Sequence, residues 1–375
     1  MISFVKGLFH DLSYRISKMI HHLETEKFHP DISKTFFDNT LVMLKALRDY
    51  TQQTINSGDL DIDGLATNNL ANYNNIYEKF QAVELFRFEV IVNYGEPEHY
   101  FNRKITRIYD EIKNTQVPPL ITTISNSESY YWAHPGFGII AVPAGEEKNL
   151  LNLPDLYHEI GHLIFKQYHS FLLGTFVNIL EKHFNDEMTR VVDEHRPPYL
   201  LQFYRNILDK WKNGWLEEFT CDLIATYLVG PAYAWTNLKL STYSSRNDRI
   251  YYVGSTTHPS DEARMRITLE MLHMTGHATE AIQVKKSWDE FLLATSNLVP
   301  RDYHLVFPQP LLDELVGNVL HGCQAIGLSS YTDQITEHGT PISLILNNAW
   351  HTLLNSPSDF DKWESDAIDQ IRSSL

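Results

Sequence analysis

The chain has 375 residues, of which 43% are hydrophobic and 12% aromatic, so it is a globular protein and not a disordered one. Asp and Glu number 47 against 31 Lys and Arg, which gives a net charge of −16. Nonspecific nucleic-acid binding needs a basic surface, so we predict no nucleic-acid partner.

Cysteine content and apolar runs bear on the cellular compartment. The two cysteines, Cys221 and Cys323, lie far apart in the sequence and cannot make a disulfide framework, which favours a reducing compartment. The N-terminus lacks the pattern of a signal peptide, and no apolar run is long enough to cross a bilayer. We therefore expect a soluble, cytoplasmic protein with no membrane partner.

The first 115 residues have helical periodicity. An apolar stripe over residues 2–23 predicts a core helix, and the alternative of a membrane-surface helix is weaker because no basic cluster dominates its polar face. Residues 31–56 and 66–92 predict two more long helices, and another follows Pro97. Residues 1–115 are thus predicted to be a helical N-terminal module.

A short β region follows. The β-branched and aromatic runs 120–125, 130–133 and 138–142 alternate with turn residues and predict a small sheet directly before residue 154. One of its strands has an edge to which an extended peptide can add; alternatively, the strands only cover the back of the following helix. The sequence does not choose between these two roles.

Residues 154–165 contain His158, Glu159 and His162 in the order HExxH. In a helix the two histidines lie one turn apart on one face, so both can bind a single Zn²⁺, while Glu159 lies beside the metal as a general base and then acid. The alternative is a buried amphipathic helix with two solvated histidines. Four apolar side chains are expected on the opposite side: Leu156, Ile160, Leu163 and Ile164.

A catalytic zinc site needs a third protein ligand and an open position for water. Helices are predicted over 170–184, 197–212 and 215–229, the last ended by Gly230-Pro231. On it Glu218 and Asp222 are four residues apart and share a face. Glu218 is the predicted third ligand, and Asp222 is predicted to accept the second ring N–H of a ligating histidine. Glu217, expected to point elsewhere, is the reserve ligand, and Cys221 is a weaker one.

These two helices together resemble the gluzincin metallopeptidases. The segment from His258 to Arg264, HPSDEAR, is similar to the His-Pro and Arg of the CAAX prenyl protease and minigluzincin branch. The resemblance implies a zincin-like core, a His258 that steadies the oxyanion, and an Arg264 that supports the site. An alternative role for His258 is to stabilise its turn. An oxyanion-assisting tyrosine is expected among three candidates: Tyr233, Tyr251 and Tyr252.

The resemblance covers roughly residues 130–275. Members of that membrane branch carry transmembrane helices, which this chain lacks, so a prenylated or membrane substrate does not follow. Further helices are predicted over 278–295, 310–325, 341–355 and 359–373. The predicted fold is α+β, mainly α: a helical module (1–115), a zincin-like core with its small sheet beside the HExxH helix (116–276), and a helical C-terminal region packing on that core (277–375).

The functional prediction is a zinc-dependent metallopeptidase that acts on a peptide or protein. Zn²⁺ is the expected cofactor, with His158, His162 and Glu218 as ligands and Glu159 as base. Two other classes remain open: a metal-stabilised binding or scaffold protein built on a peptidase core, and a zinc hydrolase of small amides.

Overall fold

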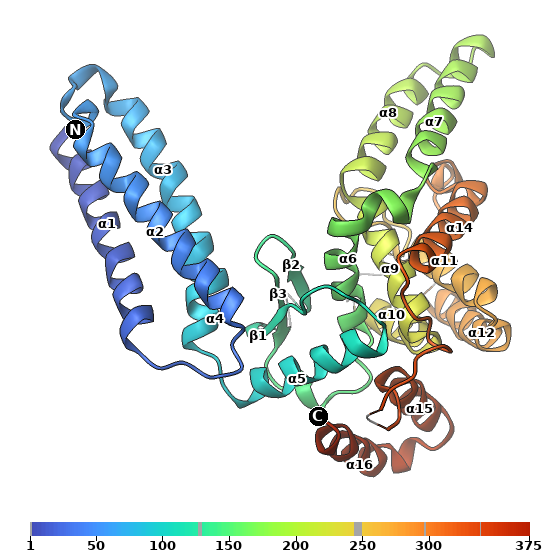
Figure 1. Ribbon diagram of the computed structural model, residues 1–375. Coiled ribbons are helices and arrows are strands. Elements are labelled where there is room, and N and C mark those ends of the chain that lie inside the picture. The colour runs from blue at the N-terminus through green and yellow to red at the C-terminus, as the bar shows by residue number, and fades with distance from the viewer. Residues whose placement is uncertain (1, 127–129, 244–249, 296–297, 338) are drawn as a thin grey trace. The chain divides into compact units, whose positions relative to one another are not determined.

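The computed structural model describes residues 2–126, 130–243, 250–295, 298–337 and 339–375. The described chain is mainly helical with one small three-stranded sheet, which confirms the predicted mainly α, α+β class (Figure 1). It divides into two compact units. The first is Met1–Asn102 with Pro119–Ile124, and the second is Arg103–Pro118 with Ser125–Leu375.

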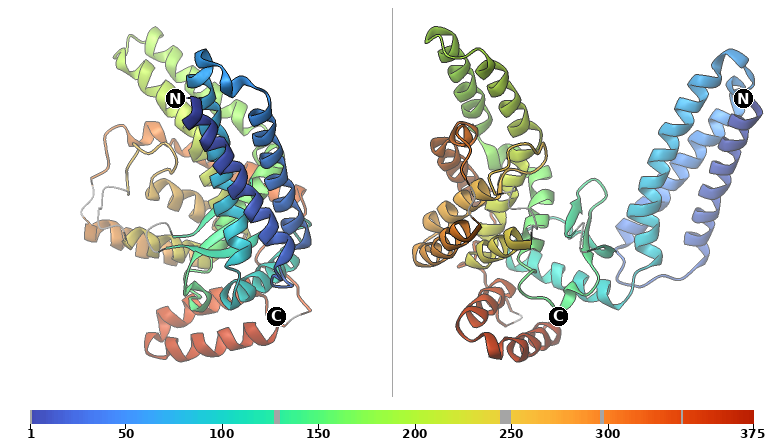
Figure 2. Two further views of the ribbon diagram at one scale, coloured as in Figure 1. Left: turned by 90° about the vertical axis from the view of Figure 1, so that its left-hand side faces the viewer. Right: turned by 180° about the vertical axis from the view of Figure 1, so that it is seen from behind.

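The first unit is built on three long helices, which lie side by side in both views of Figure 2: α1 (Ile2–Thr25), α2 (Lys34–Asn56) and α3 (Ala66–Val83). The apolar stripe of α1 is buried between the other two, as expected of a core helix. Helix α2 begins three residues later than predicted because the Ser33 hydroxyl caps it, accepting from the Phe36 N–H. A π-helical turn, Glu84–Phe88, joins α3 to α4 (Glu89–Val92), so the predicted 66–92 helix runs its full length with a bulge.

The sheet contains β1 (Leu120–Ser125), β2 (Trp132–His134) and β3 (Ile139–Pro143) in the order β1-β3-β2. Strands β2 and β3 are antiparallel, with Ala133 opposite Ile140. All five residues of β3 are buried, because this strand is central in the sheet. Strand β2 also contacts helix α6 (Asp155–Leu173), so the sheet lies beside the HExxH helix as predicted.

The core of the second unit is made by α6, α9 (Leu216–Val229), α11 (Asp261–Met274) and α14 (Gln309–Ala325), which pack against one another. The first two turns of α6 and nearly all of α9 are buried on every side. The side of α6 that carries the two histidines faces α9, so His158 is buried and His162 is 15% exposed.

One predicted helix is interrupted in the structure. The 170–184 segment is not one helix: α6 ends at Leu173, and α7 (Phe176–Asp193) begins after a break at Gly174. Gly174 adopts a φ of 50°, outside the helical region, and a side chain there would meet Asn318. Within α6, Tyr168 also leaves helical geometry, which bends the helix beyond the HExxH residues.

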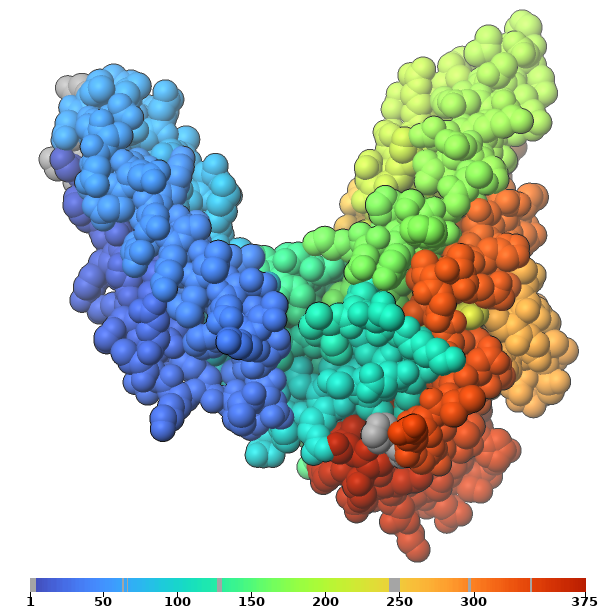
Figure 3. All heavy atoms as spheres, viewed as in Figure 1, coloured from blue at the N-terminus to red at the C-terminus, as the bar shows by residue number. Residues whose placement is uncertain are grey.

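The remaining helices surround this core. Helices α7 and α8 (Tyr199–Lys210) pack against each other as a hairpin (Figure 1), and their atoms form the yellow-green projection of the second unit in Figure 3. The other elements are α5 (Glu96–Glu111), a π-helical turn (Trp211–Trp215), α10 (Pro231–Tyr243), α12 (Ala278–Thr295), α13 (Tyr303–Val306), α15 (Ile342–Asn355) and α16 (Phe360–Ser373), with 3₁₀ turns at Asp59–Asp61, Asp63–Leu65, Glu146–Lys148 and Pro357–Asp359. Across the described residues, every helix is too short or too polar to cross a membrane.

Candidate metal centre

The centre lies where α6 crosses α9. These helices lie close together at Gly161, inside the HExxH sequence: a Cβ there would stand 3.0 Å from Cys221 Cα and 3.1 Å from Cys221 Cβ. Any larger residue would push the helices apart. This close approach brings the histidines of α6 onto the carboxylates of α9. Cys221 is itself buried and packs against α6 at this crossing. Burial raises the pKa of its thiol well above the ordinary value, so Cys221 is a poor ligand.

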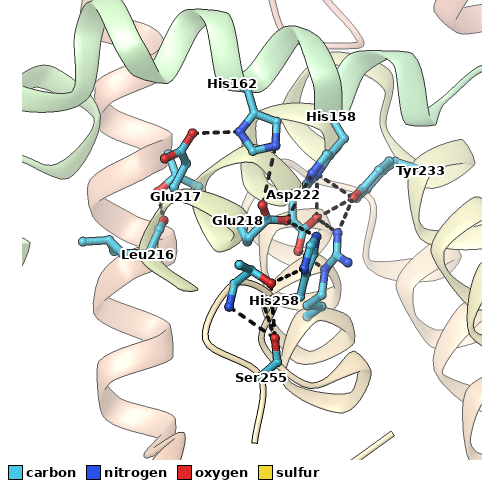
Figure 4. Close-up of polar contacts among 12 residues, drawn as sticks. His158, His162, Leu216, Glu217, Glu218, Asp222, Tyr233, Ser255 and His258 are labelled. Carbon is cyan, nitrogen blue, oxygen red and sulfur yellow. Dashed lines mark hydrogen bonds and ion pairs between the residues drawn. The ribbon is translucent and has the colours of Figure 1, made fainter. Parts of the chain in front are cut away.

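Three predicted ligands converge at this crossing. The Nε2 atom of His158 lies 3.5 Å from Glu218 Oε2, and Nε2 of His162 lies 3.7 Å from Glu218 Oε1 (Figure 4). One donor atom from each residue falls within 4.8 Å of the other two. Ligands about 2.0–2.1 Å from a tetrahedral zinc stand roughly 3.3 Å apart, so small side-chain movements are enough to place all three on one ion.

Glu218 is suited to a cation by its surroundings. Its Oε2 atom is buried and has no hydrogen-bond partner among the described residues. Burial alone raises the pKa of this carboxyl, but the neighbouring His158 and the charge of Arg264 outweigh that effect and hold the pKa at about 2. Glu218 is therefore an ionised carboxylate with a free, buried oxygen directed at two imidazoles.

The second nitrogen of each histidine meets a carboxylate. His158 Nδ1 lies 2.9 Å from Asp222 Oδ1, as predicted, and His162 Nδ1 lies 2.8 Å from Glu217 Oε1 (Figure 4). The prediction that Glu217 points elsewhere is wrong, because the α6–α9 crossing brings it alongside His162. Both rings are thus turned so that Nε2 faces Glu218.

Asp222 is fully buried and held from two sides. Arg264 donates from Nε to Oδ2 at 2.7 Å and from Nη2 to Oδ1 at 2.6 Å. The hydroxyl of Tyr233 donates to the same Oδ1 and lies 3.2 Å from His158 Nδ1. Burial raises the pKa of Asp222, but Arg264 and His158 outweigh it, so the pKa is well below the ordinary value. Asp222 is a permanent anion behind His158.

The three tyrosine candidates are now distinguishable. Tyr233 is buried and faces Nδ1 of His158, the side of the ring away from Glu218, so it orients the ring and does not reach toward a substrate. Tyr251 packs edge to face against Tyr303, with ring centroids 5.1 Å apart, and Tyr252 is exposed. Among the described contacts, neither Tyr251 nor Tyr252 makes a polar bond to the ligands.

Glu159 is 5% exposed. Burial raises the pKa of its carboxyl to about 7, although His158 and His162 act in the opposite direction. Within the described chain, its carboxylate accepts no hydrogen bond. A carboxyl with a pKa near neutrality and free oxygens can both take up and release a proton.

His258 is on the loop before α11, with Nε2 3.6 Å from Glu218 Oε2 and Nδ1 2.9 Å from the Thr257 hydroxyl. Its side chain is 61% exposed. Ser260 caps the N-terminus of α11 by accepting a hydrogen bond from the Ala263 N–H. His258 therefore lies at the open side of the centre, and Arg264 at its buried side.

The His258 loop packs against the end of α8 and the π-helical turn that follows it. Lys210 Nζ donates to the carbonyls of Val253 and Gly254, and the Trp215 indole donates to the Ser255 carbonyl at 3.1 Å. The backbone of Gly214 is in close contact with the loop, because a Cβ there would clash with the Thr256 carbonyl and stand 3.1 Å from Thr257 Cα. The turn thereby holds His258 over the centre.

Comparison with protein-family models, with curated proteins and with solved structures found no match. Four contributors to the centre were missed by sequence reasoning: Gly161, Lys210, Gly214 and Trp215. The small residue inside HExxH is a signal of close helix packing that was available in the sequence. The other three act through contacts between segments about 40 residues apart, for which the sequence has no local signal.

Proposed function

We propose that this chain is a zinc-dependent metallopeptidase of the gluzincin type. The proposal rests on one observation: His158 and His162 converge on the ionised, buried carboxylate of Glu218. Glu159 follows the first of these ligands in the sequence. Two imidazoles and one carboxylate, with a fourth position left open, are the ligand set of a catalytic zinc. A purely structural zinc is normally closed by four protein ligands.

When bound there, Zn²⁺ supplies the Lewis acid that polarises the scissile carbonyl and lowers the pKa of the attacking water. Glu159 takes up the proton of that water and passes it to the leaving amine nitrogen. Its pKa of about 7 suits this double role, because the group is then neither a strong acid nor too weak a base.

Asp222 and Glu217 set the protonation of the two ligating rings. Each carboxylate accepts from an Nδ1–H, which leaves the Nε2 lone pair directed at the metal. Arg264 neutralises Asp222 and fixes its plane through a two-point contact. Zinc and a proton compete for His158, since Asp222 and Glu218 hold its pKa well above the ordinary value against the effect of burial.

His258 is assigned to the oxyanion. Its Nε2 lies on the exposed side of Glu218, and its Nδ1 faces the Thr257 hydroxyl, so the Nε2–H tautomer can donate to an oxygen that develops charge. The exposed position also allows the ring to adjust as substrate enters.

An extended peptide is favoured over a small amide by the neighbouring sheet. In the described sheet β2 pairs on one side only, with β3, and it contacts α6. A peptide that pairs with the other side of β2 would run along the helix that carries the zinc ligands.

The test uses protein refolded or purified with zinc, and a peptide library read by mass spectrometry. We expect about one firmly bound zinc per chain to be lost in Glu218→Ala, and cleavage to fall by at least about 100-fold in Glu159→Gln while zinc is retained. Glu290→Gln, at an exposed site in α12, is the matched control. Equal cleavage by Glu159→Gln, or no cleavage by the zinc-loaded wild type, would contradict the peptidase assignment and favour a binding protein.

A further inference from the structure

A second group of metal-ligand side chains lies in the first unit. His29 and Asp31 are in the connection between α1 and α2, and His99 is in the first turn of α5. One donor atom of each lies within 4.8 Å of the other two. Two segments that are 68 residues apart in sequence thus present two imidazoles and one carboxylate to a single point.

The three side chains lie in direct contact with one another. Buried Nδ1 of His99 forms an ion pair with Asp31 Oδ2. The rings of His29 and His99 lie 5.1 Å apart and are inclined at 48°, so they are not stacked. Two imidazoles and a carboxylate gathered in this way can exchange their mutual contacts for bonds to a common cation.

The surroundings suit a metal ion from solvent. Both histidines are half-buried, whereas Asp31 is exposed, so a cation can reach its carboxylate from solvent. The Tyr94 ring packs against the His29 ring, with ring centroids 5.0 Å apart, and restricts the orientation of the imidazole. The N–H of Asp31 faces His29 Nδ1 at 3.3 Å, a long contact that costs little to exchange for a metal bond.

We propose that His29, Asp31 and His99 form a second divalent metal site, of the type that takes Zn²⁺. Two imidazoles and a carboxylate are borderline ligands that favour zinc and its first-row neighbours over Mg²⁺ or Ca²⁺. The metal joins the α1–α2 connection to the start of α5, so its role is to stabilise the fold of the first unit. This site is independent of the peptidase assignment.

The experiment counts zinc per full-length chain after dialysis against a buffered zinc concentration, in wild type, His99→Ala, Glu218→Ala and the double variant. We expect two, one, one and none. His10→Ala, an exposed histidine in α1, is the matched control and should bind two. In the Glu218→Ala background, Co²⁺ should give a visible ligand-field spectrum that His99→Ala abolishes.

A structural readout separates metal binding from misfolding. In the Glu218→Ala background, zinc should slow amide hydrogen exchange in residues 26–33, and should not do so once His99 is replaced. Circular dichroism checks that His99→Ala keeps its helices. The site would be refuted if folded His99→Ala bound as much zinc as wild type, or if zinc left exchange in 26–33 unchanged.

Discussion

Arg264 donates two hydrogen bonds to Asp222, and Asp222 in turn contacts Nδ1 of His158. A residue on α11 therefore helps to orient a proposed ligand on α6. Arg264→Lys keeps the positive charge but loses the planar two-point contact. We expect the zinc dissociation constant to rise by about 10- to 100-fold, the range typical of lost support behind a ligand.

Chelator competition measures that constant. Arg301→Lys, at an exposed position, should leave it unchanged. An unaltered affinity in Arg264→Lys would mean that the charge alone suffices.

Glu217 supports the second histidine in the same way, but from a side chain that is 44% exposed. Solvent screening weakens its contact with His162 Nδ1. Glu217→Gln should therefore raise the zinc dissociation constant by only about tenfold, less than loss of Asp222 by Asp222→Asn. An effect of Glu217→Gln larger than that of Asp222→Asn would argue that Glu217 itself binds the metal, as the reserve ligand.

Gly214 supports the His258 loop through close contact. Gly214→Ala should displace Thr256 and Thr257 and lower kcat by about tenfold or more while zinc binding stays normal, because no ligand is moved. Gly317→Ala is the control: that glycine lies inside α14 with open space around its missing Cβ, so activity should persist. Loss of zinc in Gly214→Ala would show that the π-helical turn shapes α9 itself.

The pKa of Glu159 leads to a pH dependence of stability in protein stripped of metal. Between about 4.5, the unfolded value, and about 7, the folded chain keeps a proton that the unfolded chain has released. The stability contributed by Glu159 is thus complete below the lower pH and is lost as the pH rises through 7.

Glu159→Gln removes this loss. In urea unfolding with a chelator present, the free energy of unfolding of the variant should increase relative to that of the wild type as the pH rises. The increase should reach at most about 3 kcal/mol above pH 8 and should be absent at pH 4. A difference that does not vary with pH would mean that Glu159 titrates normally in the folded protein.

For Lys104 we predict the opposite trend, a stability that rises with pH. It is fully buried in α5, and burial lowers its pKa to about 7, with Glu147 acting against that shift. From pH 7 to 10.5 the unfolded chain holds a proton that the folded chain lacks, so stability rises with pH. Lys104→Met should exceed the wild type in free energy of unfolding by roughly a few kcal/mol at pH 7, and the excess should shrink toward pH 10. Lys286→Met, on the surface, should show no such trend.

The features that the sequence determined by itself follow local periodicity. His158 and His162 share a face because they are four residues apart in a helix, and the same spacing places Glu218 and Asp222 together. The strands near 120–143 and the end of α9 at Gly230 follow from turn and capping chemistry over a few residues. These predictions needed no knowledge of distant contacts.

Only the tertiary structure decided which residues meet across the chain. The partner of Glu217 depends on the angle at which α9 crosses α6, and the role of Gly214 depends on a loop about 40 residues further along. The convergence of His29, Asp31 and His99 depends likewise on how two distant segments pack. Such contacts are set by the burial and packing of whole helices, and neither periodicity nor spacing within one element encodes them.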